Sequence, residues 1–133
     1  MYEKTVTIPE HAWKSSFQPS FEFIITDSTT PYNVFLVMRH TEKYNFNNIY
    51  INLHVTEPGQ DTAVIIRRDL ILANNEGWLG AGMDDIYEVR LPLAERYPLK
   101  TGKYKFTIEQ IMREDPLDNV LNAGLRLERE KTK

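Results

Sequence analysis

The sequence predicts an all-β protein, a two-sheet antiparallel β-sandwich of about eight strands that resembles a jelly roll. Three observations favour this class. Apolar and polar residues alternate along most of the chain, clusters of turn-forming residues separate the alternating stretches, and helix signals are few and short. Many short strands without intervening helices are typical of sandwiches and jelly rolls.

The alternation is clearest at residues 49–56, where Ile49, Ile51, Leu53 and Val55 share one face. The segment 33–41 is apolar on both faces through its middle, which indicates a central strand covered on both sides. The expected strands, in order, are residues 4–8, 21–26, 33–41, 49–56, 62–73, 86–93, 103–110 and 123–129. Single helical turns are expected from Asp115-Pro116 to Leu121 and at residues 93–97.

Length and composition indicate one globular domain covering residues 1–133. The net charge is −3 and the basic residues are scattered, with Arg67-Arg68 the only adjacent pair away from the C-terminal end. A phosphate-binding groove or a polybasic membrane patch needs clustered positive charge, so we expect no nucleic-acid partner. The chain has no cysteine, which excludes disulfides, thiolate metal sites and a cysteine nucleophile.

Residues 74–85, NNEGWLGAGMDD, hold three glycines around Trp78. Their order, G-x-x-G-x-G, is the reverse of the dinucleotide motif, and Asp84, Asp85 and a strand pattern follow instead of a helix, which argues against phosphate. Adjacent aspartates on an extended chain point to opposite sides, so the calcium signal is weak. We interpret the segment as a wide connection whose glycines supply positive φ and close backbone approach, with Trp78 folded over the sandwich edge.

Catalytic motifs are missing: the sequence has no G-x-S-x-G, no H-E-x-x-H and no cysteine. His11, His40 and His54 are far apart and are predicted to be structural, satisfied histidines. We therefore expect no enzyme, no cofactor and no metal site. The abundant carboxylates leave a hydrolase as a third, weaker hypothesis.

Sugar binding is the strongest alternative that the residues themselves suggest. The stretch EKYNFNNIY alternates aromatic and amide side chains, and with Trp13 and Trp78 it could present rings and hydrogen-bonding groups to a sugar. The competing interpretation is that these aromatics pack at the sandwich edge. The candidate ligand or partner contacts are Trp78, Asp84, Asp85, Tyr44, Phe46 and Tyr50.

Four segments together resemble one family, the GldH-type gliding-motility lipoproteins of Bacteroidetes. They are YEKTVTIPEHAWKSSFQPSFEFIITD, YNVFLVMRHTEKYNFNNIYINL, GWLGAGMDDIYEVRLPL and GKYKFTIEQIMREDPLDNVLNAGLRLER. The resemblance covers nearly the whole chain, and its motifs are distributed along it.

The resemblance implies a lipoprotein of the bacterial envelope, anchored at the outer membrane by an acylated cysteine and required for gliding in species that glide. It implies no catalytic residues. We interpret the chain as the mature portion of such a protein, with the signal segment and the anchor cysteine absent. The expected partners are other envelope or motility-machinery proteins, with a glycan as the alternative, and the membrane only through the lipid anchor.

Overall fold

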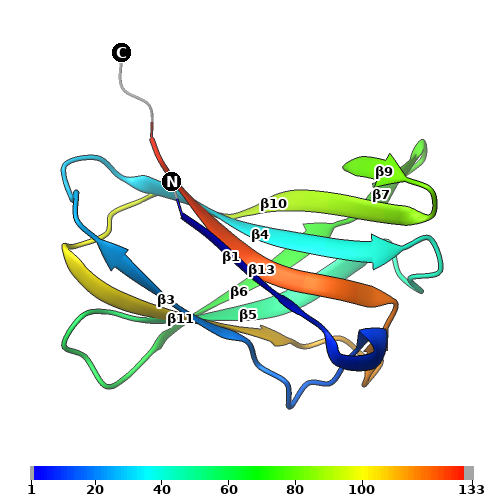
Figure 1. Cartoon of the computed structure of the whole chain (residues 1–133), viewed down its shortest axis with the longest axis horizontal. Helices are drawn as coiled ribbons and strands as arrows, with labels where there is room; N and C mark the ends of the chain where they lie inside the picture. The colour runs from blue at the N-terminus through cyan, green and yellow to red at the C-terminus, as the bar shows by residue number, and fades with distance from the viewer. Residues whose placement is uncertain (1, 131–133) are drawn as a thin grey trace.

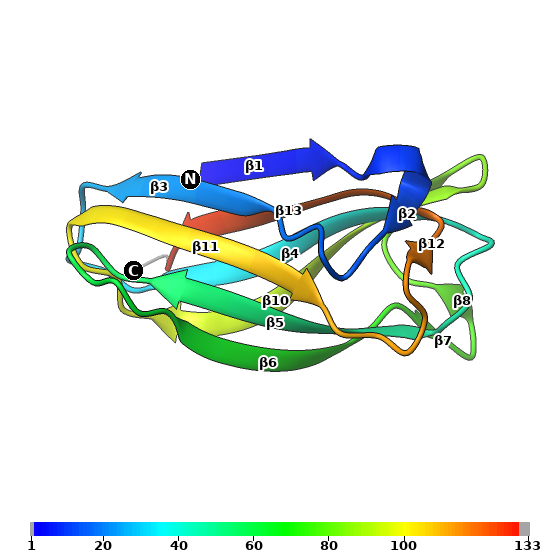
Figure 2. The same cartoon turned by 90° about the horizontal axis from the view of Figure 1, so that it is seen from below.

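The computed structural model describes residues 2–130, which form two antiparallel sheets packed face to face (Figure 1; Figure 2). One sheet has the strand order β1-β13-β4-β10-β9, and the other has the order β3-β11-β5-β6. The long strands are β1 (Tyr2–Thr7), β3 (Ser20–Ile25), β4 (Tyr32–Thr41), β5 (Asn48–Thr56), β6 (Val64–Ile71), β10 (Ile86–Tyr97), β11 (Gly102–Gln110) and β13 (Val120–Arg129). The predicted all-β sandwich is confirmed.

The long strands pair in a nested order: β1 with β13, β3 with β11, β4 with β10, and β5 with β6. The first long strand thus pairs with the last, and each later strand pairs one step further in. A long hairpin wound on itself in this way gives the two Greek keys of a jelly roll. The winding leaves β1 and β9 at the edges of one sheet and β3 and β6 at the edges of the other.

The core lies between the sheets and follows the predicted alternation. Ile49, Ile51, Leu53 and Val55 are at most 1% exposed, and β4 is central, between β13 and β10. Trp13, which the sequence offered as a sugar-binding ring, is fully buried and donates from Nε1 to the Phe17 carbonyl oxygen at 2.8 Å. Trp13 therefore belongs to the core.

Both predicted helical turns are wrong. Residues 93–97 continue β10, which follows β4 as far as Tyr97 through two register shifts after Pro92. In the other segment, β12 (Leu117–Asp118) pairs with β2 (Ala12–Trp13), and β13 begins at Val120. Partner strands distant in sequence satisfy these backbone groups, and this outweighs the local helix signals. The one helical turn in the described part of the chain is η1 (Pro9–His11).

Short elements gather at one end of the sandwich, on the right in both views (Figure 1; Figure 2). β7 (Ala73–Asn74) pairs with β8 (Gly77–Trp78), and β9 (Ala81–Met83) pairs with the start of β10. The glycine-containing stretch is thus more ordered than the wide connection expected from the sequence. Within residues 2–130, no helix is long and apolar enough to cross a membrane.

Candidate functional site

Trp78 is the centre of an aromatic group at this end of the sandwich. Its ring centroid lies 4.6 Å from that of His40, 6.0 Å from that of Tyr87 and 6.2 Å from that of Tyr44. Phe46 extends the group with an edge contact to Tyr44 at 6.0 Å. We call these five residues the Trp78 cluster. Trp78 itself is half-buried, so the β7–β8 hairpin is anchored by a ring that keeps one side near solvent.

His40 is one of the two residues of this cluster, with Tyr87, that sequence reasoning did not name as candidate contacts. It is fully buried, and its Nδ1 lies 2.9 Å from the Thr41 carbonyl oxygen, so Nδ1 carries the proton and donates. Nε2 is buried and has no hydrogen-bond partner among the described residues. Burial lowers the pKa of His40, because the charged imidazolium would lose its hydration among these rings. The prediction of satisfied histidines is therefore wrong for one nitrogen of His40.

The alternation could have placed His40 inward, since it has the same parity as Val34, Leu36 and Met38 on β4. The side chains that contact His40 inside the sandwich could not be predicted from its neighbours in the sequence. Its ring partners come from the β7–β8 hairpin, from β10 and from the turn after β4. Only the fold brings those segments together.

Three of the aromatic residues expected to serve a sugar site, Tyr44, Tyr50 and Trp78, do not share one surface. Tyr44 is 4% exposed, and its hydroxyl donates to the Asn48 carbonyl oxygen at 2.8 Å. Burial raises the pKa of this hydroxyl. Tyr50 lies on the outer face of β5, with the guanidinium of Arg67 5.5 Å from its ring centroid. Trp78 packs against Tyr44 and not against Tyr50, so one flat surface cannot contain all three rings.

Asp84 and Asp85 form the exposed turn between β9 and β10. Asp84 has a φ of 58°, and the Asp85 carbonyl oxygen accepts a 2.9 Å hydrogen bond from the Glu42 amide. In the part of the chain that the structure describes, no group of three His, Cys, Asp or Glu side chains is placed to hold a metal ion. The aspartates therefore make a negatively charged turn beside Met83.

Among residues 2–130, Met83 is the most exposed large apolar side chain, at 79%. It pairs with Ile86 across the β9–β10 hairpin, on the outer face of the five-stranded sheet. Beside it is a shallow hollow of about 120 Å³ lined by Arg39, Ala81, Met83, Asp84, Ile86 and Glu88. We call Met83, Asp84, Asp85 and Ile86 the hairpin tip.

Glycines hold the hairpin tip against the Trp78 cluster. Gly82 lies on the Tyr87 ring, where an added Cβ would come within 2.7 Å of a ring carbon. Gly80 has a φ of 89°, and a Cβ there would be 2.2 Å from the Glu88 carbonyl oxygen. Both reasons expected from the sequence, positive φ and close backbone approach, therefore apply in this stretch.

A second group of polar side chains lies on the outer face of the four-stranded sheet. Glu109 Oε1 lies 3.0 Å from His54 Nε2 and accepts a 3.3 Å hydrogen bond from Asn52 Nδ2. All three are partly exposed and follow Tyr50 along this face. We call Tyr50, Asn52, His54 and Glu109 the Tyr50 face. The sequence did not reveal it, because Glu109 reaches the others only through the β5–β11 register.

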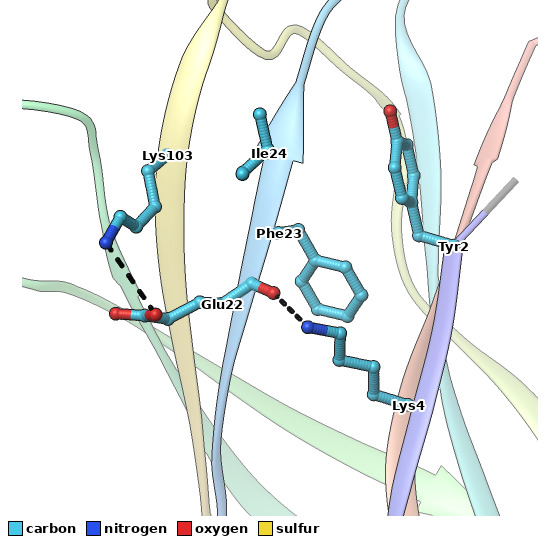
Figure 3. Close-up of a pocket in the computed structure, with 6 residues that line it drawn as sticks. All are labelled: Tyr2, Lys4, Glu22, Phe23, Ile24 and Lys103. Atoms are coloured by element: carbon cyan, nitrogen blue, oxygen red, sulfur yellow. Dashed lines mark hydrogen bonds and ion pairs between the residues drawn. The ribbon is translucent and has the colours of Figure 1, made fainter.

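A third surface feature is the groove between edge strands β1 and β3 (Figure 3). Its volume is about 270 Å³; Phe23 and Tyr2 pack edge to face at 6.0 Å, and Lys4 and Lys103 flank Glu22. Lys4 Nζ donates to the Glu22 carbonyl oxygen at 2.7 Å and lies 5.4 Å from the Phe23 ring centroid. The hydrogen bond joins β1 to β3, so we interpret the groove as the closure of the sandwich on this side.

Comparison with known proteins gives a family and a fold. The model of the GldH lipoprotein family matches residues 1–127. A gliding motility lipoprotein GldH homolog of Christiangramia forsetii is 29% identical, covering 90% of this chain and 78% of that protein. Gliding motility lipoprotein GldH of Flavobacterium johnsoniae is 33% identical, covering 88% and 77%.

Among solved structures, the chain resembles a carbohydrate-binding module, CBM28, described as specific for non-crystalline cellulose. The TM-score is 0.50 with 14% identity, and the match covers 97% of this chain and 73% of the module. At this identity the likeness shows a shared β-sandwich fold.

Proposed function

Because the chain belongs to the GldH lipoprotein family, we propose that it is a non-enzymatic interaction module of a gliding-motility or outer-membrane-associated assembly. Membership implies membrane anchoring in the cell envelope. We further propose that the membrane in which the lipoprotein is anchored is the outer membrane. In this arrangement the sandwich presents a protein-binding surface close to the membrane.

The hairpin tip is the contact we assign to the partner. One observation carries this assignment: Met83 is 79% exposed although its hairpin is held by close backbone packing. An exposed apolar side chain on a backbone that is already ordered can enter a partner's pocket at a lower entropy cost than one on a flexible loop. Asp84 and Asp85 lie next to it, so a pocket with a basic rim fits this surface.

The test is site-specific photo-crosslinking in the native cells. A photoreactive residue replaces Met83 in one variant and Ile24 in the other. Ile24 is a matched control because it is also an exposed apolar residue on an edge strand, at 63%. We expect discrete adducts with envelope proteins from position 83 only. Identical products from both positions, or none from position 83, would contradict the assignment.

Carbohydrate binding remains a second candidate, and the Tyr50 face favours it. This face combines a half-exposed ring with amide, imidazole and carboxylate groups on one sheet surface, which is the chemistry that sugar sites use. The CBM28 module binds sugar by its description and has the same fold class.

A glycan array including peptidoglycan fragments, followed by titration, tests this candidate. If the Tyr50 face binds sugar, Tyr50→Ala abolishes binding, whereas Trp78→Phe leaves it unchanged. Retention of binding in Tyr50→Ala would move the site elsewhere, and no binding to any glycan would remove the candidate.

A further inference from the structure

Strand β6 is a free edge whose exposed side chains are self-complementary. It is the last strand of its sheet, and within the described residues 2–130 it pairs only with β5. Its outer-face side chains are Ile65, Arg67, Asp69 and Ile71, and each is more than half exposed. Exposed apolar residues on an edge strand are unusual, because such edges are templates for pairing with another chain.

The hydrogen-bonding direction of each β6 residue follows from the ladder. The Leu72 amide donates to the Asn47 carbonyl oxygen at 2.7 Å, so Leu72 faces β5. Antiparallel residues alternate in direction, and therefore residues 64, 66, 68 and 70 also bond to β5. Residues 65, 67, 69 and 71 direct their amide and carbonyl groups away from the sheet. The four side chains on the outer face thus belong to the residues whose backbone faces the free edge.

We propose that a second copy of this chain binds along β6, so that two β6 strands pair antiparallel about a two-fold axis at Arg68. In this register Arg67 of each copy lies opposite Asp69 of the other, and Ile65 lies opposite Ile71. Each of these opposing pairs exchanges two backbone hydrogen bonds, since their amides and carbonyls face the edge. The two four-stranded sheets become one continuous sheet with an isologous interface.

Charge fixes the register. Shifting the pairing by two residues in one direction places Arg67 opposite Arg67, and the other direction places Asp69 opposite Asp69. Like charges directly opposite one another are destabilising. A shift by one residue is not possible. It would place the edge-facing backbone amides and carbonyls of one copy opposite residues of the other copy whose backbone groups already bond to β5. Pairing centred on Arg68 is the register that joins unlike charges.

Arg68, at the centre of the β6 edge, makes hydrogen bonds that must be compatible with the proposed β6–β6 pairing. Arg68 turns inward, donates from Nε to the Leu93 carbonyl oxygen at 2.6 Å, and donates from Nη1 to the Arg67 carbonyl oxygen at 2.9 Å. A carbonyl oxygen has two lone pairs, so Arg67 can also accept from the second copy. On the inner side, Val64 is 53% exposed and would lie opposite Leu72 of the second copy, which adds apolar burial.

Sedimentation velocity and charge-swapped variants test the proposal. The wild-type chain should show a monomer–dimer equilibrium below about 100 μM, with masses near 15.6 kDa and about twice that value. Arg67→Asp and Asp69→Arg should each be monomeric in the same range. An equimolar mixture of the two variants should form a heterodimer. The double variant carrying both changes keeps the wild-type net charge and should restore the homodimer.

The matched control is the exposed pair Lys103 and Glu22 on the same sheet, at its other edge. Exchanging those two charges should leave the association unchanged. Circular dichroism of every variant checks that the sandwich has formed. A wild-type chain that stays monomeric up to about 100 μM overturns the proposal, as does equal association of the single and double variants.

Amide hydrogen exchange by NMR tests the interface itself. Residues 66, 68 and 70 should be protected at all concentrations, because they bond to β5. Residues 65, 67, 69 and 71 should become protected only as the dimer forms. A dimer in which the second set stays unprotected would place the interface elsewhere and overturn the proposal. Neither result depends on the partner assigned to the hairpin tip.

Discussion

Arg68 Nε donates a 2.6 Å hydrogen bond to the Leu93 carbonyl oxygen and thereby joins edge strand β6 to β10 of the facing sheet. At the opposite open side, Lys4 on β1 makes the equivalent 2.7 Å bond to the Glu22 carbonyl oxygen on β3 (Figure 3). Each open side of the sandwich is thus closed by a cation that reaches across to a backbone carbonyl. A long side chain suits this task because its stem covers apolar surface while its head bonds at the rim.

Removing the Arg68 bond should lower stability. Arg68→Met keeps most of the apolar stem but leaves the Leu93 carbonyl oxygen without this donor, which should cost about 1–2 kcal/mol of unfolding free energy. Urea denaturation at low micromolar concentration measures it. Lys105→Met, an exposed cation on the central strand β11 of the same sheet, is the control and should change stability by less than about 0.5 kcal/mol. Equal effects of the two variants would contradict a bridging role.

The Trp78 cluster should contribute substantially to stability. Trp78→Ala removes a half-buried ring that contacts His40, Tyr44 and Tyr87, and should cost about 2–3 kcal/mol. Trp78→Phe keeps part of the packing and should cost roughly half as much. Chemical denaturation followed by far-UV circular dichroism gives both values. A loss below about 0.5 kcal/mol for the alanine variant would mean that the ring is free for a ligand.

Acid should destabilise the fold through His40. Burial lowers its folded-state pKa below the value near 6.5 of the unfolded chain, so the unfolded state binds more protons between the two values. The contribution of neutral His40 is complete above about pH 6.5 and is lost as the pH falls through the folded-state pKa.

Unfolding free energies at pH 7.5 and 5.5 measure this loss. His40→Phe fits among the same rings and cannot be protonated, so its stability should fall less between these two pH values than that of the wild-type chain. Parallel declines in both proteins would assign the acid sensitivity to other groups.

Substitution of Gly77 and Gly80 should distinguish the cost of backbone strain at positive φ from the cost of a steric clash with an added Cβ. Both have positive φ, at 115° and 89°, but an added Cβ meets nothing within 4 Å at Gly77 and lies 2.2 Å from the Glu88 carbonyl oxygen at Gly80. Gly77→Ala should therefore show only backbone strain of about 1–2 kcal/mol. Gly80→Ala should cost at least about 1 kcal/mol more, because β10 must move. Thermal denaturation of the two variants compares them, and equal losses would contradict the close approach.

Local pattern determined which segments are strands. Alternation at residues 49–56 and 103–110 correctly separated buried from exposed faces, because every second side chain of a strand points to the same face of the sheet. The helix signals at residues 93–97 and 115–121 gave wrong predictions, because the backbone groups there bond to distant partners on β4 and β2. Local helix propensity contributes less to stability here than the backbone hydrogen bonds of a fully paired strand.

The sequence by itself determined the sandwich class and the order of the strands along the chain, and it named three of the five residues of the Trp78 cluster, Trp78, Tyr44 and Phe46, as candidate contacts. Tertiary structure alone decided which strands lie at edges, that Tyr50 faces away from that cluster, and that His40 is buried among rings from three other segments. The physical reason is the difference in sequence separation between the residues that each kind of interaction relates. Side-chain alternation acts over two residues, whereas nested pairing joins residues as far apart as Tyr2 and Leu127, and no local signal specifies those partners.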